Sequence, residues 1–137
     1  MTNYPVSEIS DIGADDAGRL KAAGIRTTLG LLDAARNPKG RKLLADEIGI
    51  NEKRILSWAN AADRMRIKGI GSEYADLLQA AGVDTVKELK YRNPAKLAEA
   101  MASINSKRKL ARVLPSPRAV ERWVEQAKKI QLKISYR

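Results

Sequence analysis

The amino-acid sequence predicts an all-α fold, built from two tandem helical units that pack as one compact domain. Glycine and proline stand between apolar-periodic stretches, and no stretch keeps the two-residue alternation of a strand. In addition, residues 12–27 recur as residues 70–85. A repeat that covers so much of a short chain indicates internal duplication, with each copy supplying one unit.

The two copies of the repeat align without a gap. Nine positions match in register, and Ile25 against Val83 is the one exchange among them. Each copy begins with Ile-Gly and later runs through Ala-Ala-Gly to a threonine. Gly24 and Gly82 stand where a helix would end in a left-handed turn. This shared spacing predicts the same helix, turn and helix in both copies.

Capping signals mark where the helices begin. Asn37, Asn93 and Ser116 each precede a proline, the arrangement of an N-cap followed by proline at the first helical position. Asn51 stands before another helical stretch, and Thr85 begins the capping box Thr-x-x-Glu. The predicted helices cover residues 5–10, 14–23, 27–36, 38–48, 52–67, 72–81, 85–91, 94–103 and 117–133.

The last predicted helix of each unit carries one tryptophan, Trp58 or Trp123, on an apolar stripe with i, i+3, i+4, i+7 spacing. Core packing is favoured over a ligand-binding role, so we expect both rings to be buried. The first unit is placed at residues 1–65 and the second at 66–137. The second unit has a basic insertion at 105–116 and a basic closing helix.

The positive charge of the chain is concentrated near its end. The net charge is +10, and residues 105–137 alone hold ten Lys/Arg against two Asp/Glu. This asymmetry predicts a surface for a polyanion, with a solvated basic tail as the alternative.

Cysteine and histidine are absent, which removes disulfides, thiolate nucleophiles, imidazole bases and the usual zinc sites. The chemistry that remains possible is that of carboxylates, lysines or hydroxyls. We expect no enzyme, cofactor or metal site. No window approaches a membrane span and no leader pattern begins the chain, which predicts a cytoplasmic protein.

The turn that opens each repeat has the form of a phosphate site. In the second turn (residues 69–71), two glycines around an isoleucine allow positive φ, while Ile70 plugs into the core. The N–H groups of Gly69, Gly71 and Ser72 would then form a concave nest at the start of the next helix, where the helix dipole favours a phosphate oxygen. Ala75 would be small enough for close packing on the preceding helix.

The segment Gly69-Ile70-Gly71-x-x-x-Ala75-x-x-Leu78-x-x-Ala81-Gly82-Val83 resembles a helix-hairpin-helix motif. Many DNA repair and replication proteins use this motif to hold duplex backbone without reading sequence. The two-copy arrangement, with a tryptophan in each closing helix, is similar to an uncharacterised bacterial family of tandem helix-hairpin-helix domains, the domain of unknown function 4332. The resemblance implies an all-helical fold and covers most of the chain.

Both copies depart from the motif. The first turn (residues 11–13) has Asp11 in place of the first glycine, and two further aspartates follow. Carboxylates repel a polyanion, so we expect a structural or protein-contacting role there. In the second copy Glu73 stands where the family often has a basic residue, and the cations of Arg66 and Lys68 are expected to compensate.

The leading interpretation is therefore a non-enzymatic, sequence-independent duplex DNA-binding module. A helical protein–protein adaptor is the alternative, and a lyase with a lysine Schiff base is a third hypothesis. The sequence leaves the oligomeric state open. The predicted DNA contacts are Arg66, Lys68, Gly69, Ile70, Gly71, Ser72, Lys107, Arg108, Lys109 and Arg112.

Overall fold

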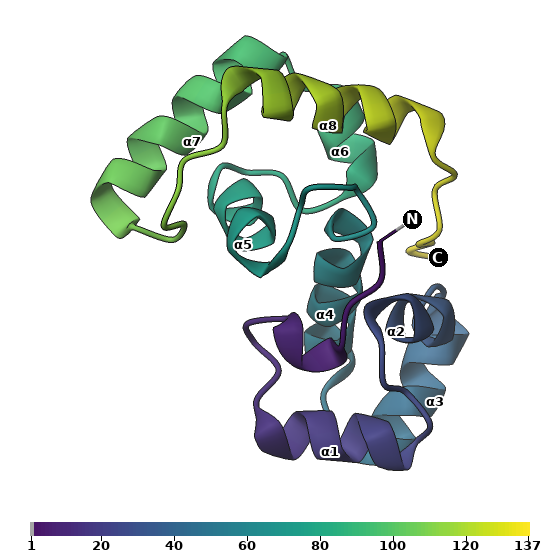
Figure 1. Ribbon diagram of the computed structural model, residues 1–137. Coiled ribbons are helices and arrows are strands. Elements are labelled where there is room, and N and C mark those ends of the chain that lie inside the picture. Colours follow the sequence, from purple (N-terminus) through teal and green to yellow (C-terminus); the bar gives the residue numbers. More distant parts are fainter. Residues whose placement is uncertain (1) are drawn as a thin grey trace.

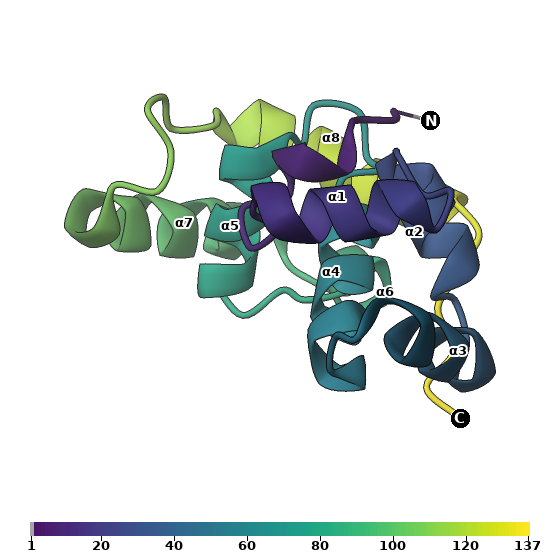
Figure 2. The same cartoon turned by 90° about the horizontal axis from the view of Figure 1, so that it is seen from below.

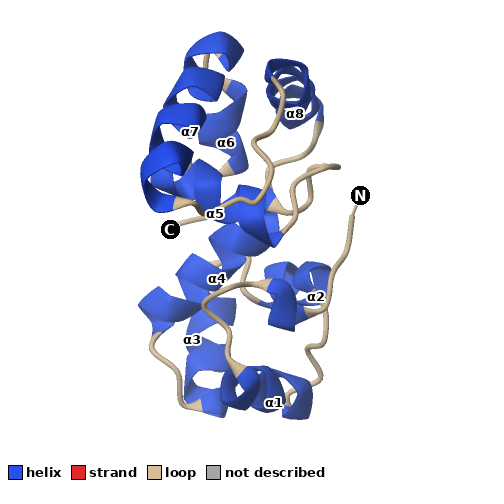
Figure 3. Cartoon of the chain, turned by 60° about the vertical axis from the view of Figure 1, so that its left-hand side comes forward, coloured by secondary structure: helices blue, strands red, loops and turns tan. Residues whose placement is uncertain are grey.

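Eight α-helices and one short 3₁₀ helix make up the regular structure of residues 2–137, the part of the chain that the computed structural model describes. No β-strand occurs in that range, which confirms the all-α prediction (Figure 3). The 3₁₀ helix η1 (Val6–Glu8) comes first. It is followed by α1 (Ala14–Ala22), α2 (Thr28–Ala34), α3 (Pro38–Ile48), α4 (Glu52–Arg64), α5 (Ser72–Ala80), α6 (Val86–Lys90), α7 (Pro94–Arg108) and α8 (Pro117–Lys129).

The expected capping residues begin these helices. The side-chain oxygen of Asn37 accepts a hydrogen bond from the Gly40 amide at 2.8 Å, and that of Asn93 accepts one from Lys96 at 3.0 Å. Thr85 and Ser116 cap α6 and α8 in the same way. Each cap satisfies a backbone donor that the first helical turn leaves free. The sequence-based helix starts are therefore confirmed.

The core runs through both parts of the molecule along α4, which joins α1–α3 to α5–α8 (Figure 1). In the first part α2 and α3 pack on α4, and in the second α6 and α7 pack on α8. Trp58 of α4 and Trp123 of α8 are 0% and 3% exposed. Burial of both tryptophans is confirmed, and Ile70 lies in the same core.

Helix α7 is longer than predicted. It runs to Arg108 instead of residue 103 and so includes the first four residues of the expected insertion. No glycine or proline interrupts these residues. The positive charges of lysine and arginine in the last turn interact favourably with the helix dipole and stabilise the helix. Lys109 caps the C-terminal end of the helix, with a left-handed φ of +50°. Asn105 then holds the following loop through hydrogen bonds of 2.9 and 3.1 Å with Ala111.

The last segment of the chain also differs from the prediction. Helix α8 ends at Lys129, and the remaining residues extend across to the first part of the molecule (Figure 1). There the Ser135 amide donates to the Arg36 carbonyl at 2.7 Å, and the Arg41 guanidinium donates to the Ser135 carbonyl at 2.9 Å. These tertiary hydrogen bonds replace the helical ones, which explains why the helix stops early.

Helix α4 likewise ends three residues before the predicted position, because the amides of Arg66 and Ile67 bond three residues back and tighten the chain into the second turn. None of the helices within residues 2–137 combines the length and apolar character that a membrane crossing requires.

Candidate functional site

The second turn leads from the end of α4 into α5, and its two glycines have different conformations. Gly69 has a φ of +98°, which only glycine adopts readily, whereas Gly71 is extended at −93° and caps α5. The positive φ that the glycines were expected to allow is therefore found at Gly69 and not at Gly71. The amides of Gly69 and Gly71 make no hydrogen bond to residues 2–137, whereas the Ile70 amide donates to the Ile67 carbonyl at 3.1 Å.

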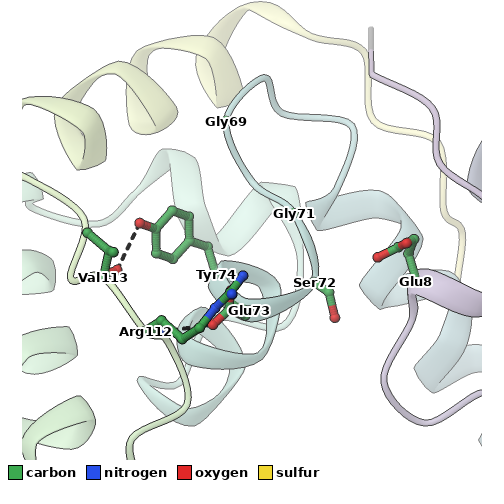
Figure 4. A pocket seen from close by; sticks show the side chains of 8 residues that line it. All are labelled: Glu8, Gly69, Gly71, Ser72, Glu73, Tyr74, Arg112 and Val113. Carbon is green, nitrogen blue, oxygen red and sulfur yellow. Dashed lines mark hydrogen bonds and ion pairs between the residues drawn. The ribbon is translucent and has the colours of Figure 1, made fainter.

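The loop after α7 lies against this turn through two side chains of α5 (Figure 4). The Glu73 carboxylate accepts from the Arg112 amide at 2.9 Å and forms an ion pair with its guanidinium at 3.3 Å. The Tyr74 hydroxyl donates to the Val113 carbonyl at 2.8 Å. Figure 2 shows the rest of this loop reaching outward between α7 and α8. Residues 109–116 thus have defined contacts.

The charge of Glu73 is neutralised within the site. Hydrogen bonds from the Arg112 amide and guanidinium lower the pKa of the Glu73 carboxyl. The carboxylate therefore stays ionised and occupied by Arg112, while the Arg112 side chain is 90% exposed. The negative charge of Glu73 in front of the second turn is therefore balanced by the positive charge of Arg112.

The turn, Glu73, Tyr74 and Arg112 line an open pocket of about 780 Å³. Glu8 reaches the opposite side of the pocket from η1 (Figure 4). The Ser72 hydroxyl lies 3.1 Å from that of Ser10. The pocket therefore combines free backbone donors with one exposed cation and one unpaired carboxylate. Such a site can hold a small anionic group against the N-terminus of α5.

Arg66 does not belong to this site. Its side chain is buried, and its guanidinium forms an ion pair with Asp63 and donates to the Gln131 carbonyl at 2.9 Å. The prediction of a phosphate contact is wrong for this residue, because a buried and paired charge cannot reach a ligand. Arg66 instead links α4 to the segment that follows α8.

The remaining predicted cations are spread over the second part of the molecule. Lys68 is exposed, while its amide donates to the Gln126 side chain of α8 at 3.0 Å. Lys107 and Lys109 lie at the exposed end of α7, and Arg108 lines a separate pocket beside α5. Among the four predicted insertion cations in the described chain, Arg112 is the one that lines the pocket of the second turn.

The first turn differs from the second because the side chain of Asp11 fills the corresponding place. The Asp11 carboxylate accepts a hydrogen bond from Trp58 Nε1 at 2.8 Å, and the Arg54 guanidinium pairs with Asp16 at 3.0 Å. Arg54 also lies over the Trp58 ring, 5.2 Å from its centre. Asp11 thus has a structural contact, in agreement with the role expected for the first turn.

Within residues 2–137 no three carboxylates gather closely enough to hold a metal ion. No solved structure was found to match the chain. Residues 10–130 match the family described as "Domain of unknown function (DUF4332)". This match covers most of the chain. It includes both turns and all eight α-helices, and it stops before the segment that follows α8. The protein therefore belongs to the DUF4332 family.

Proposed function

We propose that this chain is a cytoplasmic, non-enzymatic module that binds duplex DNA without reading its sequence, and that its two turns are helix-hairpin-helix motifs. The observation that carries the proposal is the pair of free amides at Gly69 and Gly71, which line an open pocket at the N-terminus of α5 beside the exposed Arg112. Free N–H groups at a helix N-terminus are suited to a phosphate oxygen.

The distribution of charge supports the same proposal. The excess of Lys/Arg over Asp/Glu in residues 105–137 gives the second part of the molecule a positive field. Lys107, Lys109 and Arg112 are all exposed, and the two lysines at the end of α7 would meet phosphates farther along the duplex than the turn does. Contacts of this kind position the backbone and carry no base information. Binding would then depend on counterion release and weaken steeply with salt.

Gly71→Val tests the role of the turn. Gly71 has an ordinary extended φ, and a Cβ built there meets no other atom within 4 Å, so the variant should fold. Its branched side chain would nevertheless stand in front of the free amides. We expect Gly71→Val to lose most duplex binding, measured by fluorescence anisotropy with a labelled duplex at low salt.

Gly13→Val is the matched control. Gly13 caps α1 with a φ of −80°, and a Cβ there also meets nothing within 4 Å. The first turn is occupied by Asp11, so binding should be unchanged. Equal losses from the two substitutions would overturn the assignment to the second turn, and undetectable binding by the wild-type protein would overturn DNA binding itself.

A further inference from the structure

The two buried tryptophans differ in what their indole N–H groups meet. In the first part, Trp58 Nε1 donates to the Asp11 carboxylate at 2.8 Å. The position of Asp11 in the repeat corresponds to Gly69, which has no side chain. A Cβ at residue 69 would come within 2.9 Å of Trp123 Nε1, so the second indole lies directly against the place where a side chain is missing.

The indole N–H of Trp123 has no acceptor in residues 2–137. No fully buried side-chain donor in this range lacks a partner, so the N–H reaches the solvent although the residue is only 3% exposed. Trp123 is held in place by the tilted ring of Tyr74, whose centre is 5.3 Å away. The result is a donor in a fixed position on a residue that lines a pocket, open to an acceptor from outside the chain.

This pocket, of about 560 Å³, lies between the second turn, α8 and the loop before α8. Lys68 and Arg122 line it, and neither side chain has a hydrogen bond or ion pair within the described chain. Val113 and Leu114 form part of its apolar wall while remaining 69% and 46% exposed. The pocket thus combines one N–H donor without a protein acceptor, two free cations and exposed apolar side chains.

We propose that this pocket binds a carboxylate of a partner protein, supplied by an acidic side chain or a chain end that is flanked by apolar residues. The ligand carboxylate would accept from Trp123 Nε1, as Asp11 accepts from Trp58, and would be balanced by Lys68 and Arg122. The proposal goes beyond DNA binding and does not depend on it. Gly69, Tyr74 and Val113 line both pockets, but Lys68, Arg122 and Trp123 line this pocket and not the one in front of Gly71.

Two features favour a protein carboxylate over a phosphate of nucleic acid. The same molecule already places a carboxylate on the corresponding indole, which shows that the donor and acceptor fit. The exposed Val113 and Leu114 also need an apolar neighbour, which a peptide side chain provides and a phosphate backbone does not.

The test follows the two indole N–H resonances of the full chain in ¹H–¹⁵N NMR spectra. The probes are the N-acetylated, C-amidated peptide Leu-Glu-Leu, its Leu-Gln-Leu counterpart, and Leu-Gln-Leu with a free terminal carboxylate. The Glu peptide or the free-carboxylate peptide should shift the Trp123 resonance at millimolar concentration, and the amidated Gln peptide should not. The Trp58 resonance serves as the internal control, because its N–H is already bound to Asp11.

Variants then assign the contacts. Trp123→Phe keeps an aromatic ring but removes the indole N–H donor, and should weaken peptide affinity about tenfold or more. The double variant Lys68→Gln/Arg122→Gln changes exposed side chains, so it should fold normally and lose affinity in a salt-dependent manner.

Phosphate or duplex DNA that shifts the Trp123 resonance while the carboxylate peptides do not would overturn the proposal, and so would no response to any probe. Gly71→Val should leave the peptide response intact, which separates this pocket from the proposed DNA site.

Discussion

Gly69→Ala is the substitution for which the structure gives the clearest magnitude. A φ of +98° is strained for any residue with a side chain, at a cost of roughly 1–3 kcal/mol. The new Cβ would also come within 2.9 Å of Trp123 Nε1. Trp123 is buried against Tyr74 and cannot move aside freely, and overpacking of this kind costs about 1–3 kcal/mol. Together the two effects predict a loss of about 2–6 kcal/mol.

Thermal unfolding followed by far-ultraviolet circular dichroism measures this loss. For a chain of this size we expect the Tm to fall by about 10 °C or more. Gly71→Ala is the matched control, because its extended φ and open surroundings predict a change within about 0.5 kcal/mol. A wild-type Tm for Gly69→Ala would refute the close approach of the turn to the indole, and with it the fixed position of the Trp123 donor.

Two further predictions concern charged pairs. Asp63→Asn removes the charge partner of the buried Arg66 and should cost about 3 kcal/mol, measured by urea denaturation; an unchanged midpoint would contradict the buried pair. Because the folded-state pKa of Glu73 is lowered, its tie to Arg112 is fully present above the ordinary glutamate pKa and is lost as pH falls through the lowered value. The Arg112 amide resonance should therefore move in acid below the ordinary glutamate pKa, and a transition at or above that pKa would contradict the contact.

Much of the fold could be predicted because its signals are local. An asparagine or serine before proline specifies a helix start through its own side chain, and all such starts are confirmed at Asn37, Asn93 and Ser116. The apolar stripes around Trp58 and Trp123 likewise specify a buried face. Helix ends were less predictable, because α4 tightens into the second turn through local bonds three residues back, whereas α8 stops where the following chain bonds to the first part of the molecule.

The candidate site was predicted less well, because it depends on which charges meet in space. Nothing in the sequence indicates that the Arg66 side chain is unable to reach a phosphate. In the structure it is buried and forms an ion pair with Asp63, three residues earlier. The pairing of Glu73 with Arg112 joins residues that are far apart in the chain. The free indole of Trp123 did have a signal in the repeat, since Asp11 aligns with Gly69, yet its meaning required the Asp11–Trp58 hydrogen bond.

The most direct test of the DNA-binding account is a salt titration of duplex affinity for the wild-type protein and for a variant with Lys107, Arg108, Lys109 and Arg112 changed to alanine. Each lost phosphate contact should flatten the log–log salt dependence by about one unit, equally for duplexes of different sequence. The account predicts tight wild-type binding at low salt and a flatter, weaker response in the variant. An unchanged slope would remove these four residues from the interface, and no wild-type binding at low salt would contradict the account.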